Sequence, residues 1–282
     1  MADKSLKSEL RNTWESAAPG WAKWEHVFTT GFAGATDALI DLAGIRPGMR
    51  ILDLACGAGS QTIQVARRVG PNGKVVASDI SSTMLEHVRR SAAREGLQNI
   101  ETLECAADEL DKAQAPFDAS LCRMGLMLFP SPSKALEAVQ LVLKPGARFS
   151  ALVFTTPTNN PFLAQPMAIL LRHARKSAPS PGQPGLFALG ASGTLESLMK
   201  DSGFVGVEMN TMRVRLALPN VSDALRLLQE GAGAYRAVVA DLSDEAQSKA
   251  WDEVHECLRR FEICGSFGTD LEVVIGSGAR PS

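Results

Sequence analysis

The stretch Arg50–Ser60, RILDLACGAGS, joins a short apolar run to a turn of small residues. Polar and apolar residues alternate too little in its first five positions for a strand with one solvent-exposed face. The pattern is typical of a strand that is covered on both faces. Gly57 and Gly59 allow positive φ and a close approach of a ligand to the main chain. The next residues, QTIQVARRV, have helical spacing. This sequence of strand, glycine turn and helix is typical of a nucleotide site at the carboxyl end of a parallel sheet.

The turn differs from the fingerprint of dinucleotide-binding proteins. That fingerprint needs a third glycine, whereas the residues after Gly59 are Ser60, Gln61 and Thr62. The carboxylate of Asp53, just before the turn, would also repel a pyrophosphate. A second strand is expected at 74–78 and ends at Asp79. The carboxylate of Asp79 is in a suitable position to accept hydrogen bonds from both hydroxyls of a ribose. An NAD(P)-dependent oxidoreductase is therefore the less favoured alternative.

The pattern Asp53-x-x-x-Gly57-x-Gly59 followed by Asp79 resembles that of the class I S-adenosylmethionine (SAM)-dependent methyltransferases. Three later segments are similar to those of the same class: 103–110 (LECAADEL), 117–128 (FDASLCRMGLML) and 141–149 (LVLKPGARF). Within the class, the chain best resembles the small-molecule branch typified by the ubiquinone/menaquinone C-methyltransferases. The resemblance is strong over 48–154 and weak elsewhere.

The alternation of strands and helices after residue 48 predicts an α/β fold with parallel strands and right-handed crossovers. The resemblance makes this a Rossmann-like, seven-stranded, mostly parallel sheet of order 3-2-1-4-5-7-6, with helices on both faces and a helical lid. The last strand would be antiparallel. Strands are expected at 50–54, 74–78, 100–104, 117–122, 148–154, 205–208, 213–217 and 271–275.

Three regions are expected along the chain. Residues 1–45 form an N-terminal helical cap, in which Pro19-Gly20 should break the helix. Residues 46–155 form the SAM-binding α/β core. Residues 156–282 complete the core and add helical lid insertions at about 156–185 and 222–263, above the ligand crevice.

The resemblance implies that SAM is the cofactor and that S-adenosylhomocysteine (SAH) is its product. The catalytic residues are left unassigned, and no metal-ligand spacing is present. The expected cofactor-binding residues are Asp53, Ala55, Gly57, Gly59, Thr62, Asp79, Ile80, Met84, Ala106, Ala107, Asp108, Arg123 and Met124, together with Trp14 and Trp21 of the N-terminal helix.

Two of these positions depart from the family pattern. Ala106 replaces an Asp or Asn, so the adenine amino group would rely on the main chain and on Asp108. Arg123 replaces a small polar residue, and a guanidinium beside a sulfonium is unfavourable. We therefore expect Arg123 to point away or to pair with an acid such as Asp53 or Asp79.

The acceptor is expected to be a small hydrophobic or aromatic molecule, such as a quinone-like, phenolic or other natural-product metabolite, because the lid segments are rich in apolar side chains. The candidates to line its pocket are Trp14, Trp21, Trp24, Phe28, Phe162, Met167, Phe187, Tyr235 and Phe261. His26 and His173 are candidate bases. The sequence leaves open whether O, N, C or S is methylated. It also leaves open a SAM-binding enzyme that does not methylate, such as a cyclase.

Composition narrows the other possibilities. With 282 residues and a net charge of −2, the chain lacks the basic footprint of a nucleic-acid-binding protein. Its five cysteines form no CxxC pair, which favours reduced thiols and a cytoplasmic location. The N-terminal residues lack an apolar signal core, and no apolar run is long enough for a membrane span. A homo-oligomer is expected by analogy with enzymes that share lids.

Overall fold

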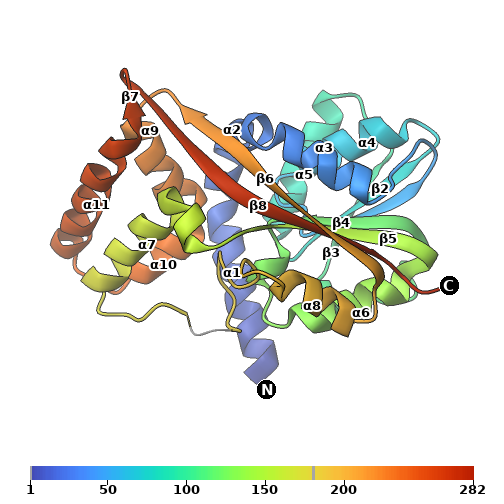
Figure 1. Ribbon diagram of the computed structural model, residues 1–282. Coiled ribbons are helices and arrows are strands. Elements are labelled where there is room, and N and C mark those ends of the chain that lie inside the picture. Colours follow the sequence, from blue (N-terminus) through green and yellow to red (C-terminus); the bar gives the residue numbers. More distant parts are fainter. Residues whose placement is uncertain (1, 180–181) are drawn as a thin grey trace.

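The computed structural model describes residues 2–179 and 182–282. Its strands are β1 (Arg50–Leu54), β2 (Lys74–Asp79), β3 (Ile100–Glu104), β4 (Phe117–Arg123), β5 (Leu143–Phe154), β6 (Val205–Leu218), β7 (Glu262–Ile263) and β8 (Ser266–Ala279). They form one twisted sheet of order β3-β2-β1-β4-β5-β8-β6, with β7 paired to β8 (Figure 1). This confirms the predicted order, because the two-residue β7 is the reason that the last long strand is numbered eight.

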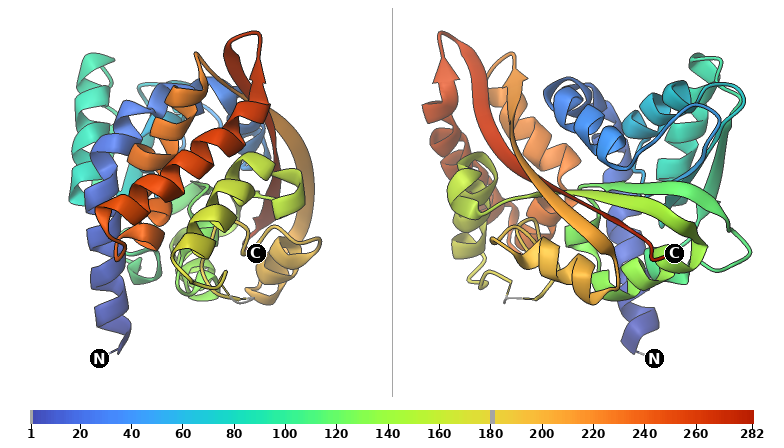
Figure 2. Two further views of the ribbon diagram at one scale, coloured as in Figure 1. Left: turned by 90° about the vertical axis from the view of Figure 1, so that its left-hand side faces the viewer. Right: turned by 45° about the vertical axis from the view of Figure 1, so that its right-hand side comes forward.

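The first five strands are parallel to one another, and β8 runs antiparallel to both β5 and β6. The predicted break between 205–208 and 213–217 is wrong, because β6 is continuous from Val205 to Leu218 along its pairing with β8. Both strands are much longer than the sequence suggested. They project beyond the rest of the sheet and carry the lid helices at that end (Figures 1 and 2).

The helices are α1 (Ala2–Lys23), α2 (Glu25–Gly31), α3 (Ala33–Leu42), α4 (Ser60–Val69), α5 (Ser82–Arg94), α6 (Pro132–Val142), α7 (Pro161–His173), α8 (Thr194–Asp201), α9 (Val221–Arg226), α10 (Gly233–Val239) and α11 (Asp244–Leu258). Figure 1 shows α3, α4 and α5 on one face of the sheet and α6 and α8 on the other. Both faces of β1 are therefore covered, as its apolar sequence predicted.

The N-terminal helix α1 is not interrupted at Pro19-Gly20, so the predicted break is wrong. Proline removes one backbone donor from a helix, which is a cost that packing can offset. Here the helix is fixed by neighbours: a Cβ at Gly20 would lie 1.9 Å from the carbonyl oxygen of Glu230. The absence of a side chain at Gly20 is what lets α1 touch the lid backbone.

The lid consists of α7, which follows β5, and of the helices between β6 and β8. These helices are α9, the π-helical turn η4 (Leu227–Gly231), α10 and α11. The two insertions pack together, because α7 contacts both α10 and α11. The helix α1 lies between this lid and the α/β core and contacts α5 on one side and η4 and α10 on the other (Figure 1).

None of the helices in the described residues has the length and apolarity that crossing a lipid bilayer requires.

Candidate functional site

The turn after β1 depends on left-handed backbone at three positions. Ala55, Gly57 and Gly59 have φ of 52°, 57° and 98°. A Cβ at Gly57 would lie 3.2 Å from Nε1 of Trp21, and one at Gly59 would lie 2.8 Å from Cγ2 of Val88. The two glycines therefore serve both the backbone angles and the close packing of α1 and α5 around the turn.

Asp79, at the end of β2, is linked directly to this turn. Its Oδ2 accepts a 2.9 Å hydrogen bond from the backbone N–H of Gly57, and its Oδ1 accepts a 3.0 Å bond from that of Ser81. The residue is 8 % exposed, and burial raises its pKa to about 6 although the backbone N–H groups act in the opposite direction. The carboxylate keeps lone pairs for further donors, such as hydroxyl groups.

Asp53 is fully buried behind the turn. Its Oδ2 accepts a 2.5 Å bond from Oγ1 of Thr62, and its Oδ1 accepts a 3.2 Å bond from Nε2 of Gln61. Burial raises its pKa to about 6 against these two hydrogen bonds and the charge of Arg123. These contacts tie β1 to the first turn of α4.

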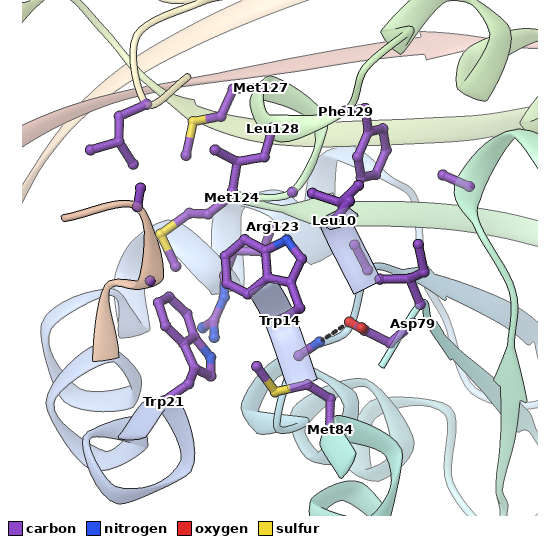
Figure 3. A pocket seen from close by; sticks show the side chains of 18 of the residues that line it. Leu10, Trp14, Trp21, Asp79, Met84, Arg123, Met124, Met127, Leu128 and Phe129 are labelled. Carbon is purple, nitrogen blue, oxygen red and sulfur yellow. Dashed lines mark hydrogen bonds between the residues drawn. The ribbon is translucent and has the colours of Figure 1, made fainter. Parts of the chain in front are cut away.

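A large cavity opens at the carboxyl ends of the parallel strands (Figure 3). Most of the predicted cofactor-binding residues line it: Trp14, Trp21, Ala55, Gly57, Asp79, Ile80, Met84, Ala106, Ala107, Asp108, Arg123 and Met124. Asp53, Gly59 and Thr62 do not line the cavity. These three residues lie behind its wall, where they shape the turn.

The N-terminal helix forms one wall of the cavity. Trp14 and Trp21 meet edge to face with ring centroids 6.4 Å apart, and Trp21 stacks on Phe28 at 4.6 Å. Lys7 forms a 2.9 Å ion pair with Asp108, the residue expected beside the adenine. The carboxylate of Asp108 is therefore paired with the ammonium group of a lysine from α1 at that end of the cavity.

Glu15 anchors the same helix to the N-terminus of α5. Its Oε1 accepts bonds from the backbone N–H (2.7 Å) and the hydroxyl (3.1 Å) of Ser82, and its Oε2 accepts one from the N–H of Thr83 (3.3 Å). Burial favours a raised pKa for Glu15, but the hydrogen bonds from Thr83 and Ser82 outweigh it, and the pKa is lowered. The carboxylate thus holds α1 over the cavity by capping another helix.

Arg123 is almost completely buried, with 6 % of its surface exposed. Its Nη1 donates a 3.1 Å hydrogen bond to Oγ1 of Thr36, and its Nη2 donates to Oγ of Ser60. It forms no ion pair with Asp53 or Asp79 among the described contacts, so the predicted pairing is wrong. Nor does it point away, because it lines the cavity. Burial lowers its pKa to about 10, which leaves it charged at neutral pH.

The other part of the cavity is apolar. Of the predicted acceptor-pocket residues, Trp14, Trp21, Phe28, Phe162 and Tyr235 line it. Trp24, Met167, Phe187 and Phe261 do not line it; Trp24 belongs to the hydrophobic core, and the other three pack against that core. Residues that the sequence analysis missed are Met127, Leu128, Phe129, Phe154, Leu216 and Leu271. Their apolar character was the available signal, but only the tertiary structure brings these strand and loop residues to one place.

The candidate bases do not reach this cavity. His26 lies beside the carbonyl oxygen of Lys23, and Nε2 of His173 lies 2.8 Å from Glu253 on the outside of the lid. Neither residue lines the cavity, so the structure does not bring these two candidates together with the other predicted site residues. Tyr235 is also engaged, since its hydroxyl donates a 2.8 Å bond to the carbonyl oxygen of Leu163.

The described residues contain no cluster of three His, Cys, Asp or Glu side chains that could hold a metal ion. What they do contain is a glycine turn, an acid at the end of the adjacent strand and an apolar chamber under helices. On a sheet of this order, these features define a Rossmann-like methyltransferase of class I.

Comparisons with known proteins agree with this class. The family model described as the ubiE/COQ5 methyltransferase family matches residues 34–173. The chain is 33% identical over 183 residues to the ubiquinone/menaquinone biosynthesis C-methyltransferase UbiE of Cronobacter sakazakii, covering 61% of this chain and 73% of that protein. It is 39% identical over 121 residues to the UbiE of Hahella chejuensis, covering 43% and 49%. The chain therefore belongs to the ubiE/COQ5 methyltransferase family.

The chain spans only about half the length of several curated relatives that it matches. The fold extends further than the sequence similarity. The crystal structure of the YcgJ protein from Bacillus subtilis superimposes with a TM-score of 0.57 at 18% identity, over 89% of this chain and 99% of that chain. At this identity the likeness concerns the fold alone.

Proposed function

We propose that the protein transfers a methyl group from SAM to a small hydrophobic acceptor with an aromatic or quinone-like ring. The observation that carries this proposal is the position of Asp79. Its buried carboxylate lies at the cavity, is bonded to the glycine turn and has the acceptor capacity that two ribose hydroxyls require.

The residues along the strand ends fit the parts of SAM in order. Ala106, Ala107 and Met84 offer a flat apolar surface for an adenine beside the end of β3. Asp79 would hold the ribose, and the turn at Ala55 and Gly57 would lie under the methionine part. The absence of a Cβ at Gly57 leaves the main chain accessible next to Trp21.

The chemistry of the acceptor follows from the rest of the cavity. Its walls are phenylalanine, leucine and methionine side chains, which favour an apolar ring over a charged or sugar-like molecule. The names of the curated relatives, which are C-methyltransferases of quinone biosynthesis, support a quinone-like ring and a carbon nucleophile. We propose this acceptor class for the present chain.

Bound SAM would supply an activated methyl group on a cationic sulfonium. A nucleophile of the acceptor would attack the methyl carbon in line with its bond to sulfur, and SAH would leave. The part of the protein is to position and desolvate the two reactants. Trp14 and Trp21 of α1 would exclude water from above, and Met124 and the turn would fix the reacting end. The hydroxyl of Tyr235 stays bonded to Leu163 and keeps α10 docked on α7.

Calorimetric titration with SAM and SAH, after removal of bound ligand by unfolding and refolding, tests the donor. We expect micromolar binding of both, followed by formation of SAH with an acceptor from a panel of quinols, phenols and indoles. A folded protein that binds neither compound would refute the proposal. Binding of SAM without turnover on any member of the panel would favour a non-methylating enzyme such as a cyclase.

A further inference from the structure

Arg123 is a buried charged residue of the cavity wall, and methyl transfer to an apolar ring does not explain its presence. A buried cation in a site for a cationic sulfonium is costly unless an anion compensates it. Burial lowers the pKa of Arg123, and two acids act against this, Asp53 from β1 and Glu25 from α2. Neither is within ion-pair distance among the described contacts, and Asp53 is already occupied by Thr62 and Gln61.

The guanidinium also has hydrogen-bond donors that are not used. Two of its five N–H groups are used, one on Thr36 and one on Ser60. Its Nε is buried and has no hydrogen-bond partner. A buried donor without a partner is expensive, and a guanidinium with unused N–H groups is suited to a carboxylate.

The position of Arg123 in the sheet indicates which carboxylate this is. The register pairs Leu54 with Ser78 and Asp53 with Leu121. Continued to the strand ends, it sets Asp79, Ala55 and Arg123 side by side on β2, β1 and β4. Adjacent strands are about 4.8 Å apart, so the backbones of Asp79 and Arg123 are separated by roughly 10 Å across the turn. A SAM molecule whose ribose lies at Asp79 and whose methionine part crosses the turn would therefore extend toward Arg123.

A second feature at the same place also favours an anion. Arg123 donates to Ser60, the first residue of the ten-residue helix α4, so the guanidinium lies at the N-terminal end of that helix. Backbone N–H groups at a helix N-terminus attract negative charge. In Figure 3, Arg123 and Asp79 lie on opposite sides of Trp14, with Arg123 on the side of Trp21.

We propose that Arg123, held by Thr36 and Ser60, binds the α-carboxylate of the methyl donor and makes the protein selective for donors that carry this group. The inference rests on the proposed use of SAM. The carboxylate would compensate the buried guanidinium and thereby offset its repulsion of the sulfonium. Arg123 is thus a binding residue for the donor.

The test compares ligands that differ only at this group. Affinities for SAH, for its decarboxylated analogue S-adenosyl-3-thiopropylamine and for 5′-methylthioadenosine are measured by calorimetry on the wild-type protein, Arg123→Met and Arg123→Gln. Loss of the carboxylate should weaken binding to the wild type by about 10- to 100-fold, the range for a hydrogen bond to a charged group. Both variants should bind SAH and its decarboxylated analogue almost equally, with 5′-methylthioadenosine unchanged.

Arg148→Met is the matched control, because Arg148 is a half-buried arginine on the neighbouring strand β5 that bonds to Ser277 away from the cavity. It should keep the wild-type preference. The glutamine variant retains a polar side chain at this position and serves if the methionine variant does not fold. The ligand series on the wild-type protein tests the proposal without any variant. Equal affinity of the wild type for SAH and its decarboxylated analogue would overturn the proposal.

Two other results would also overturn it. A variant that keeps the full preference for the carboxylate would show that another group binds it. A variant that keeps this preference but has a raised KM for acidic acceptors only would assign Arg123 to the acceptor. Failure of the folded wild type to bind either SAH or 5′-methylthioadenosine would instead refute the proposed function, so the two failures are distinguishable.

Discussion

The backbone N–H of Gly57 donates a 2.9 Å hydrogen bond to Oδ2 of Asp79. This bond joins the turn after β1 to the end of β2, the two parts of the site that the sequence shows most clearly. It also orients the carboxylate, because Oδ1 is held at the same time by the N–H of Ser81. The orientation of this carboxylate is therefore set by backbone atoms and resists changes of nearby side chains.

Replacement of Asp79 by Asn should weaken SAM and SAH binding at least about tenfold, since one acceptor oxygen becomes a donor that faces a backbone N–H or a ribose hydroxyl. Calorimetry measures the change. Asp270→Asn is the control, because Asp270 is an exposed acid on β8 that pairs with Arg215. If Asp79→Asn binds SAH as well as the control does, Asp79 does not hold the ribose.

Binding of the donor should also depend on pH through the same carboxylate. Burial raises the pKa of Asp79 to about 6, so the free protein takes up a proton there as the pH falls through this value. Only the ionised carboxylate can accept hydrogen bonds from two hydroxyls with both of its oxygens. Affinity for SAH should therefore be constant above pH 6 and fall by up to about tenfold per pH unit below it.

Asp53 has a pKa in the same range and could produce a similar slope. Asp79→Asn separates the two residues, since its affinity should lose most of the pH dependence while Asp53 remains. A slope that persists unchanged in Asp79→Asn would assign the effect to Asp53 or to another group.

Gly20 and Gly34 offer a matched pair of alanine substitutions in helices. A Cβ at Gly20 would lie 1.9 Å from the carbonyl oxygen of Glu230, whereas one at Gly34 meets nothing within 4 Å. Gly20→Ala should lower the free energy of unfolding by about 1–3 kcal/mol, the usual cost of overpacking. Gly34→Ala should raise it by about 0.5–1 kcal/mol through helix propensity. Urea denaturation measures both, and equal effects would contradict the packing of α1 on η4.

Glu15→Gln should loosen α1 without unfolding the core. The change removes the negative charge at the N-terminus of α5, where such a charge contributes about 0.3–1 kcal/mol. Hydrogen exchange of the α1 amides should become faster, and SAH should dissociate faster because α1 covers the cavity. Glu245→Gln, an exposed acid paired with Lys249, is the control. Unchanged exchange in α1 would show that other contacts hold the helix.

Much of the site was predictable from the sequence because its chemistry is local. Gly57 and Gly59 need positive φ within one turn, and Asp79 ends the next strand, so their proximity follows from the parallel arrangement of β1 and β2. The apolar runs likewise predicted most of the strands, whereas their order followed from the resemblance to the methyltransferase class. The same reasoning failed at Pro19-Gly20, because the local preference to end a helix is outweighed by packing against Glu230, over 200 residues away in sequence.

Residue types alone could not separate a cavity wall from the packing behind it. Trp21 and Trp24 have the same character and lie on the same stretch of chain, yet Trp21 faces the cavity and Nε1 of Trp24 donates to Glu230 of the lid. The same holds for the two acids, because Asp79 lines the cavity whereas Asp53 lies behind its wall. Which side of a residue faces the cavity depends on the helices that cover it, and those helices come from distant segments.

By itself the sequence determined the class of the sheet, the glycine turn and the acid beside it, because these depend on backbone angles and on alternation along short segments. Only the tertiary structure decided the environment of Arg123. Its partners Thr36 and Ser60 come from two different helices, and its free Nε is visible only when both are in place. Burial and hydrogen-bond satisfaction are properties of the assembled fold, so a charged residue at a strand end acquires its role only there.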